Sequence, residues 1–265
     1  MAWKPLMNAQ RTMRSKVQAY LAERRLAGFD LSIDAQQLAR FARFTDDTGY
    51  RGALTVAIAS RWALASEHGR RLAAARRVEV LRGFARYCLS FEPGTEIPPR
   101  LLFGPSHRRL TPHIYTVAEI RTLLHAASTL TPVGGLCAAA CATLFGLIAA
   151  TGLRISEAAG LKRADVDLPR KCLHVREGKY HKSRFVPLHS TTAQALQRYA
   201  RRRDLDPLTH DRDDFFAFDY GRAASAQNIH HAFKVLRRQL GWSARGAHRL
   251  VRIHDLRHTF ITRRL

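Results

Sequence analysis

The sequence predicts a mainly α-helical protein with a small antiparallel β-sheet, built as a helical N-terminal domain and a mixed α/β C-terminal domain. Apolar residues recur every three or four positions through most of the chain, which is typical of amphipathic helices. Short β-branched and aromatic runs bounded by turn residues occur in the second half. Five of the ten prolines fall within residues 92–112. Because repeated proline excludes helix, we expect a linker over 96–112 between domains 1–95 and 113–265.

The first domain is expected to consist of four helices, each ended by glycine or by the linker. The second helix should begin at Asp34, a residue type that suits an N-cap. In the fourth helix, apolar residues recur at helical spacing, so one face should pack inward. The expected helices cover residues 11–28, 33–49, 53–69 and 70–91, and the inward face of the last carries Leu72, Ala75, Val78, Leu81, Ala85 and Cys88.

The charge balance indicates a polyanionic partner. Lys and Arg number 44 against 21 Asp and Glu, which gives a formal net charge of +23 and a pI near 11.2. Double-stranded DNA is the expected partner, and an anionic membrane surface is the second candidate. No apolar run reaches the ~18 residues of a membrane span, and residues 1–15 lack the apolar centre of a signal peptide. We therefore expect a cytoplasmic, nucleoid-associated protein without a membrane partner.

Six arginines between Arg70 and Arg86 are expected on the outward faces of the fourth helix. Two interpretations are open: a solvated helix surface, or contact with DNA phosphates. Like charges at this density repel one another, and few acidic side chains lie nearby to neutralise them. This favours contact with phosphates. The candidates for DNA contact in this helix are Arg70, Arg71, Arg77 and Arg82.

The second domain should open with a helix capped by a Thr116–Glu119 capping box. A buried helix is expected over 137–151. Two strands, over 172–175 and 183–188, flank the segment "REGKYHK", which is typical of a hairpin with a basic tip. Amphipathic helices over 191–203 and 225–241 and an apolar strand over 215–218 complete the domain. The four cysteines form no CxxC pair, so neither a disulfide framework nor a zinc ribbon is indicated.

The segment "HDLRHTF", residues 254–260, allows two kinds of site. His254 and His258 are four residues apart, so both could face one side of a helix and bind zinc. Arg257 would then place a permanent positive charge beside the cation, which is unfavourable. The alternative is a phosphate site, for which arginine is well suited because its charge is permanent and its donors form a fixed fork. We favour phosphate.

A phosphate clamp requires a second arginine from elsewhere in the fold. The segment "ATGLRISEAAGL" offers Arg154, which follows Gly152 at the end of the buried helix. The apolar residues after it can anchor the next helix in the core. An isolated arginine at such a break is usually a surface or capping residue, so its significance depends on Arg257.

The segments "ATGLRISEAAGL", "GKYHKSRFVPL" and "HDLRHTF", in this order, resemble the three conserved boxes of the tyrosine recombinase (phage integrase) family. The helical basic domain before a linker resembles that family's core-binding domain, so the likeness spans nearly the whole chain. The resemblance implies a catalytic domain over 113–265 that exchanges DNA strands and needs no cofactor.

The resemblance also implies a role for each matched residue. Arg154 and Arg257 would hold the non-bridging oxygens of the scissile phosphate, and His254 would hydrogen-bond the same phosphate and assist proton transfer. Lys179, at the hairpin tip, would protonate the leaving 5′ oxygen. These four are the candidate catalytic residues, and no metal site is expected.

Other residues of the three boxes have weaker assignments. Lys182 and Arg184 are candidates for DNA contact, although Arg184 could instead belong only to the strand surface. Glu157 is expected to orient Arg154 or to cap its helix, and Asp255 is expected to be structural. For His258, packing beneath the site and acting within it stay equally open.

The sequence departs from the family pattern beyond the third box. The family continues with a His or Trp and then the tyrosine that attacks phosphorus, whereas all seven tyrosines here precede His254. Without a nucleophile the other groups can polarise a phosphate but form no covalent intermediate. We therefore expect a C-terminally truncated recombinase, whose family assembles as a tetramer on DNA and whose own assembly is weakened. The alternative is a non-catalytic DNA-binding remnant or decoy.

Overall fold

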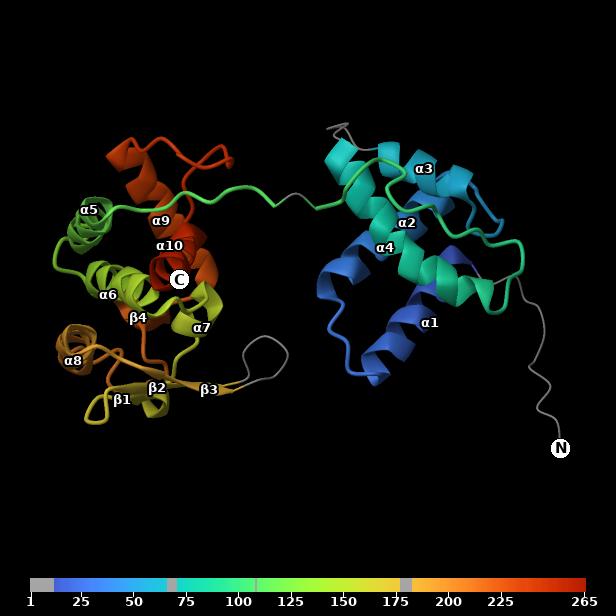
Figure 1. The fold of residues 1–265 in the computed structure, drawn as a ribbon. Coiled ribbons are helices and arrows are strands. Elements are labelled where there is room, and N and C mark those ends of the chain that lie inside the picture. The colour runs from blue at the N-terminus through green and yellow to red at the C-terminus, as the bar shows by residue number, and fades with distance from the viewer. Residues whose placement is uncertain (1–11, 66–70, 108, 177–182) are drawn as a thin grey trace. The chain divides into compact units, whose positions relative to one another are not determined.

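The computed structural model describes residues 12–65, 71–107, 109–176 and 183–265, and its contacts divide the chain into two compact units (Figure 1). Unit 1 is Met1–Arg109 and unit 2 is Leu110–Leu265. Helices dominate both units, and the strands of the described residues form small antiparallel sheets in unit 2. The predicted fold class is confirmed.

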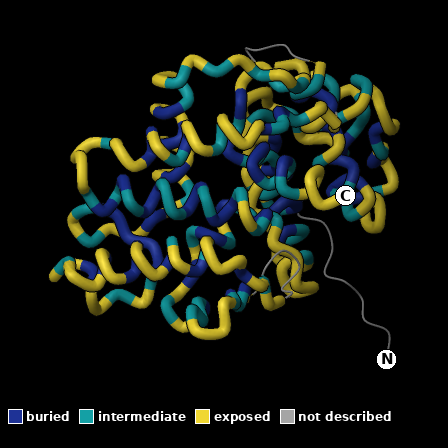
Figure 2. Tube along the Cα trace, turned by 60° about the vertical axis from the view of Figure 1, so that its left-hand side comes forward, coloured by how far each residue is buried: buried dark blue, intermediate teal, exposed yellow. Residues whose placement is uncertain are grey.

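The described part of unit 1 contains four helices, α1 (Met13–Leu26), α2 (Ser32–Asp47), α3 (Val56–Leu64) and α4 (Arg71–Leu89). Their inner faces carry the buried residues, as Figure 2 shows along the chain trace. Phe41 of α2 packs against Trp62 of α3 with ring centroids 5.2 Å apart. Asp34 is not the N-cap that the sequence predicts. It lies in the first turn of α2, because the helix begins at Ser32, whose backbone N–H is bound by the side chain of Asp30.

The proline-rich segment after α4 folds back onto unit 1. The backbone N–H of Glu96 donates to the carbonyl of Leu54 at 2.8 Å, and its carboxylate accepts from the N–H of Val56 at 2.7 Å. Arg82 of α4 donates to the carbonyl of Pro98. The first part of the predicted linker, up to residue 109, thus belongs to unit 1.

Unit 2 is organised around α6 (Leu136–Thr151), which contacts α5 (Val117–Ser128), α7 (Ile155–Ala159), α8 (Ser190–Asp204) and α10 (His254–Arg264). Neighbours on several sides explain why α6 is apolar around its circumference. A further helix, α9 (Ala226–Leu240), packs on α5 and α7. The predicted Thr116–Glu119 capping box is present at the start of α5.

Two small sheets complete unit 2. The first has the order β1 (Val166–Asp167), β2 (Cys172–Val175), β3 (Arg184–Pro187), and the second pairs β4 (Ala217–Phe218) with β5 (Arg222–Ala223). In the β2–β3 hairpin Cys172 pairs with Pro187 and Val175 with Arg184, as the predicted strands require. Both sheets are antiparallel. The predicted basic tip, with Lys179 and Lys182, lies outside the described residues.

No helix within the described ranges is both long enough and apolar enough to cross a membrane.

Candidate active site

The site is built on the break after α6. Gly152 caps this helix in the left-handed conformation, with φ of 66°, and its N–H donates to the carbonyl of Ile148. A side chain at this position would overlap the ring of Phe260, which comes from α10. Arg257 of α10 donates to the carbonyl of Gly152. The first and third sequence boxes, 105 residues apart at this bond, therefore meet here.

Arg154 lies two residues after this break, at the N-cap of α7. The carboxylate of Glu157 accepts from the backbone N–H of Arg154 at 2.9 Å and from its Nη1 at 2.7 Å. One acid therefore caps the short helix and fixes the arginine fork. Among the described residues, Nε and Nη2 of Arg154 have no hydrogen-bond acceptor, so these donors are available to a ligand.

Glu157 also holds Arg184 of β3. Nη2 of Arg184 donates to one carboxylate oxygen at 2.8 Å and Nη1 to the other at 3.2 Å. The carboxylate is 5% exposed. Burial acts to raise the pKa of Glu157, but the hydrogen bonds from Arg184 and Arg154 outweigh it and hold this pKa at about 2. The acid is therefore ionised at neutral pH and anchors both arginines.

Arg257 and His254 stand in a positively charged environment at the start of α10. Burial lowers the pKa of Arg257, and the nearby guanidinium of Arg154 lowers it further. Burial also lowers the pKa of His254, together with the charges of His258, Arg252 and Arg257. Because neighbouring like charges raise the energy of the charged forms, the cluster gains stability when an anion binds.

The remaining residues of the third box support α10. Asp255 is fully buried and accepts from the backbone N–H of Arg252 at 3.0 Å and from its Nη2 at 2.7 Å. This carboxylate caps the start of the helix, as its predicted structural role requires. The ring of His258 lies edge-on to that of His254, with centroids 4.9 Å apart.

The structure brings Arg154, His254 and Arg257 together and adds Arg184 and Glu157 beside them. No local pattern predicts the Glu157–Arg184 pair, because Arg184 follows 27 residues later on a strand. Arg184 is a candidate for DNA contact, and its Nη1 and Nη2 both donate to Glu157. Arg184 is thus paired with a carboxylate of the protein itself, although 40% of its side chain is exposed.

The four candidates for DNA contact in unit 1 differ in their surroundings. Arg71 is exposed on α4, and Arg70 lies outside the described residues. Arg77 donates to the carbonyl of Trp62 at 3.2 Å and lies over its ring. Arg82 is 7% exposed and is bound to the carbonyl of Pro98, so the expected DNA contact is wrong for this residue. Its position on the helix is covered by the returning chain.

A helical unit followed by a mixed α/β unit, with Arg154, His254 and Arg257 gathered at one helix break, defines the tyrosine recombinase class. Residues 114–265 match the model of the phage integrase family, and the chain belongs to this family. Its members act in site-specific DNA recombination.

Relatives and solved structures agree with this assignment. The integrase/recombinase y4rB of Sinorhizobium fredii is 34% identical to this chain over 96% of the chain and 82% of its own length. The Tn1549 transposon integrase, solved in complex with a circular intermediate DNA, shares the fold with a TM-score of 0.68 at 19% identity, covering 94% of this chain and 86% of that one. A lambda integrase tetramer bound to a Holliday junction gives a TM-score of 0.66 at 16% identity, covering 98% and 76%.

Proposed function

We propose that this chain binds duplex DNA and holds one backbone phosphate between Arg154, His254 and Arg257, as a step of site-specific strand exchange. The observation that carries the proposal is the bond from Arg257 to the carbonyl of Gly152, two residues before Arg154. This bond leaves Nε and Nη2 of Arg257 without acceptors among the described residues. Two arginines with unused donors at one helix break suit a tetrahedral anion.

The same arrangement favours the transition state of phosphoryl transfer. As phosphorus becomes five-coordinate, its non-bridging oxygens gain negative charge, and guanidinium groups fixed beforehand stabilise that state more than the ground state. Glu157 fixes Arg154, and the carbonyl of Gly152 fixes Arg257. We assign to Lys179 the protonation of the leaving 5′ oxygen, by analogy with the family.

We assign no nucleophile among the tyrosines of unit 2. Tyr115 and Tyr199 are buried, and their hydroxyls donate to backbone carbonyls. Tyr220 is exposed but neighbours Asp219, which caps the opposite end of α6 from Gly152. A helix of 16 residues is about 24 Å long, so Tyr220 is far from the arginines. Tyr180 lies outside the described residues.

A nicked duplex that traps covalent protein tests this assignment. We expect this chain to bind such a duplex and to form no adduct that survives denaturing electrophoresis, because the described tyrosines of unit 2, Tyr115, Tyr199 and Tyr220, are either buried or far from the arginines. A covalent adduct would contradict the assignment. Tyr180→Phe then shows whether the hairpin tyrosine is responsible.

A second candidate is a DNA-binding remnant or decoy that occupies recombination sites without cleaving them, which the formal net charge of +23 would also support. Such a protein could bind through its basic surface alone. It would then bind DNA equally well with and without Arg257, whereas the first proposal requires a loss of affinity.

Basic surfaces outside the site are the proposed contacts to the rest of the duplex. In unit 2, α9 buries Ile229, Phe233 and Leu236 and exposes a polar face on its other side. That exposed face carries His230, His231, Lys234 and Arg238. In unit 1, Arg71 is the exposed arginine of the predicted set. As in the family, we propose that copies of the chain assemble on DNA as a tetramer.

Arg71→Gln is expected to weaken duplex binding severalfold and to reduce the slope of log affinity against log salt by about 1, since one phosphate contact is lost. Arg51→Gln is the matched control, because Arg51 is a 61% exposed arginine of the same unit that lies 3.9 Å from Asp46. Fluorescence anisotropy at several salt concentrations measures both. Equal slopes for the two variants would exclude Arg71 from the interface.

A further inference from the structure

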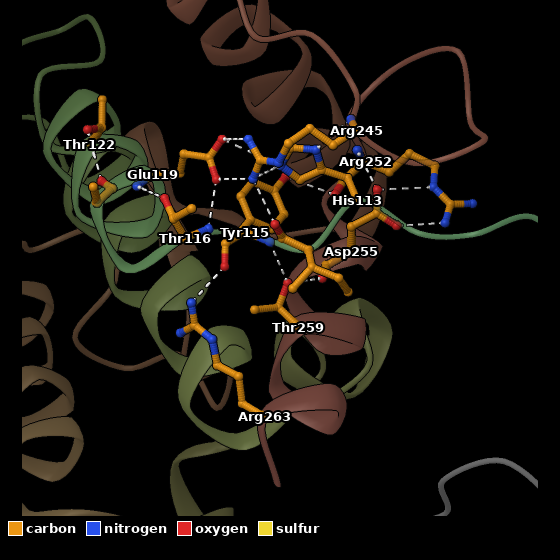
Figure 3. A network of polar contacts seen from close by, with 12 residues as sticks. His113, Tyr115, Thr116, Glu119, Thr122, Arg245, Arg252, Asp255, Thr259 and Arg263 are labelled. Carbon is orange, nitrogen blue, oxygen red and sulfur yellow. Dashed lines mark hydrogen bonds and ion pairs between the residues drawn. The ribbon is translucent and has the colours of Figure 1, made fainter. Parts of the chain in front are cut away.

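The first segment of unit 2 runs directly across α10 (Figure 3). We call residues 111–116 the strap. It begins just after the boundary between the units and ends at the N-cap of α5. Its contacts reach α10 itself and the loop over 242–253 that leads into this helix. The strap therefore adjoins the helix that carries His254 and Arg257.

Tyr115 is the residue through which the strap holds α10. Its backbone N–H donates to Oγ1 of Thr259 at 2.9 Å, and its hydroxyl donates to the carbonyl of Arg252 at 3.0 Å. Its carbonyl accepts from Nη2 of Arg263 at 2.7 Å. Its ring is 1% exposed and lies edge-on to Trp242 with centroids 5.8 Å apart.

The residues that Tyr115 binds flank, in sequence, the two phosphate-site residues of α10. Arg252 is two residues before His254, and Thr259 is two residues after Arg257. Thr259 also donates to the carbonyl of Asp255 at 2.8 Å, one turn earlier. The N-cap position of α10, Ile253, has no side-chain hydrogen bond. Besides the carboxylate of Asp255, which accepts from the backbone N–H of Arg252, contacts from outside the helix thus help to fix where α10 starts.

Arg245 fastens the loop before α10 to the same strap. Its guanidinium donates to both oxygens of Glu119, each at 2.6 Å, and to the carbonyl of Ile114 at 2.8 Å. Its backbone N–H donates to Nδ1 of His113 at 3.2 Å. The next residue, Gly246, packs so closely on the strap that a side chain there would overlap the carbonyl of Thr111.

The two halves of the phosphate site are therefore held in different ways. Glu157 fixes Arg154 from within its own box, whereas α10 carries His254 and Arg257, and the bond of Arg257 to the carbonyl of Gly152 joins the two halves. A displacement of α10 by a fraction of an ångström would separate Arg257 from Arg154 without unfolding either helix. Phosphate affinity is sensitive to such misplacement because both forks must bind one anion.

We propose that Tyr115 is a positioning residue of the phosphate site, which sets the first turn of α10 through its bonds to Arg252 and Thr259. This inference rests on the proposed function, because it assumes that Arg257 and His254 bind phosphate. Tyr115 does not touch the phosphate. It acts through the backbone carbonyl before His254 and the side chain after Arg257.

The test measures the dissociation constant for inorganic phosphate in the full 265-residue chain, from the NMR signal of the His254 imidazole at constant ionic strength. His254→Gln identifies this signal. Tyr115→Phe removes only the hydroxyl bond to Arg252 and keeps the buried ring. We expect it to raise the dissociation constant roughly fivefold, as the loss of one positioning hydrogen bond implies.

Tyr199→Phe is the matched control. Tyr199 is equally buried, and its hydroxyl both donates to the carbonyl of Ala217 at 3.1 Å and accepts from its N–H at 2.8 Å. We expect it to lower Tm at least as much as Tyr115→Phe does, with no change in phosphate affinity. An unchanged dissociation constant in Tyr115→Phe, or an equal rise in both variants, would overturn the proposal.

Arg257→Ala distinguishes a failure of the phosphate site from a failure of the positioning role of Tyr115. If this variant binds phosphate as the unaltered chain does, the phosphate site itself is wrong and the role of Tyr115 falls with it. If Arg257→Ala loses affinity while Tyr115→Phe does not, only the positioning role is refuted.

Discussion

Replacing Arg154 or Arg257 with alanine is expected to weaken phosphate binding at least tenfold in each case, with the double variant little weaker than either single one. Each guanidinium would supply charge-assisted hydrogen bonds, which contribute about 1.5–3 kcal/mol apiece. The effects should not add, because an anion that loses one fork shifts away from the other. A double-mutant cycle on the affinity for inorganic phosphate measures this coupling.

The control for this cycle is Arg170→Ala. Arg170 lies in the turn between β1 and β2, with 85% of its side chain exposed, so its loss removes the same charge from the same unit. We expect a change of less than twofold at moderate salt, since exposed charges are screened. Full additivity of the Arg154 and Arg257 effects would mean that the two arginines bind separate anions, and the proposed function would then fail.

Gly152→Ala is expected to lower the free energy of unfolding of unit 2 by about 2–4 kcal/mol. A side chain in the left-handed conformation costs roughly 1 kcal/mol. The new methyl group would also overlap the ring of Phe260, whose Cε1 lies 3.0 Å from the position of that carbon. Overpacking of this kind costs about 1–3 kcal/mol more. Urea unfolding followed by circular dichroism measures the change.

Gly241→Ala isolates the contribution of Phe260. Gly241 ends α9 in the same left-handed conformation, with φ of 62°, and a side chain there would meet no atom within 4 Å. This variant should lose only the backbone part, about 1 kcal/mol. The double variant Gly152→Ala/Phe260→Leu should recover part of the lost stability. Equal losses for Gly152→Ala and Gly241→Ala would show that Phe260 does not pack on Gly152.

Local sequence patterns predicted most helices and strands of the fold. The errors arose where contacts with distant segments of the chain determine the burial of a residue. The capping box at Thr116 was predictable because both of its residues lie in one turn. Strand β1 escaped prediction because two residues carry no alternation that distinguishes a strand from a turn. Arg82 was placed outside because helical spacing assigns faces without showing what covers them. Pro98, 16 residues later, covers that face.

For the candidate site, the sequence predicted the three central residues but not the residues that support them. Arg154, His254 and Arg257 were identified from their segments and from a family resemblance, and the structure brings them together. Their supports were not predictable. The bond from Tyr115 to Thr259 joins residues 144 positions apart, and no periodicity or motif in either segment indicates it. The sequence therefore predicted that these three residues lie together, but it did not predict the residues that hold them in place.

The strap limits how the protein can be dissected. A fragment that begins at residue 117 would keep every helix and strand of unit 2, together with Arg154, His254 and Arg257. It would nevertheless leave Arg245, Thr259 and Arg263 without the partners that Tyr115 and its neighbours provide. An independently expressed fragment of unit 2 should therefore start no later than Leu110, although residues 110–116 contribute no helix or strand of their own.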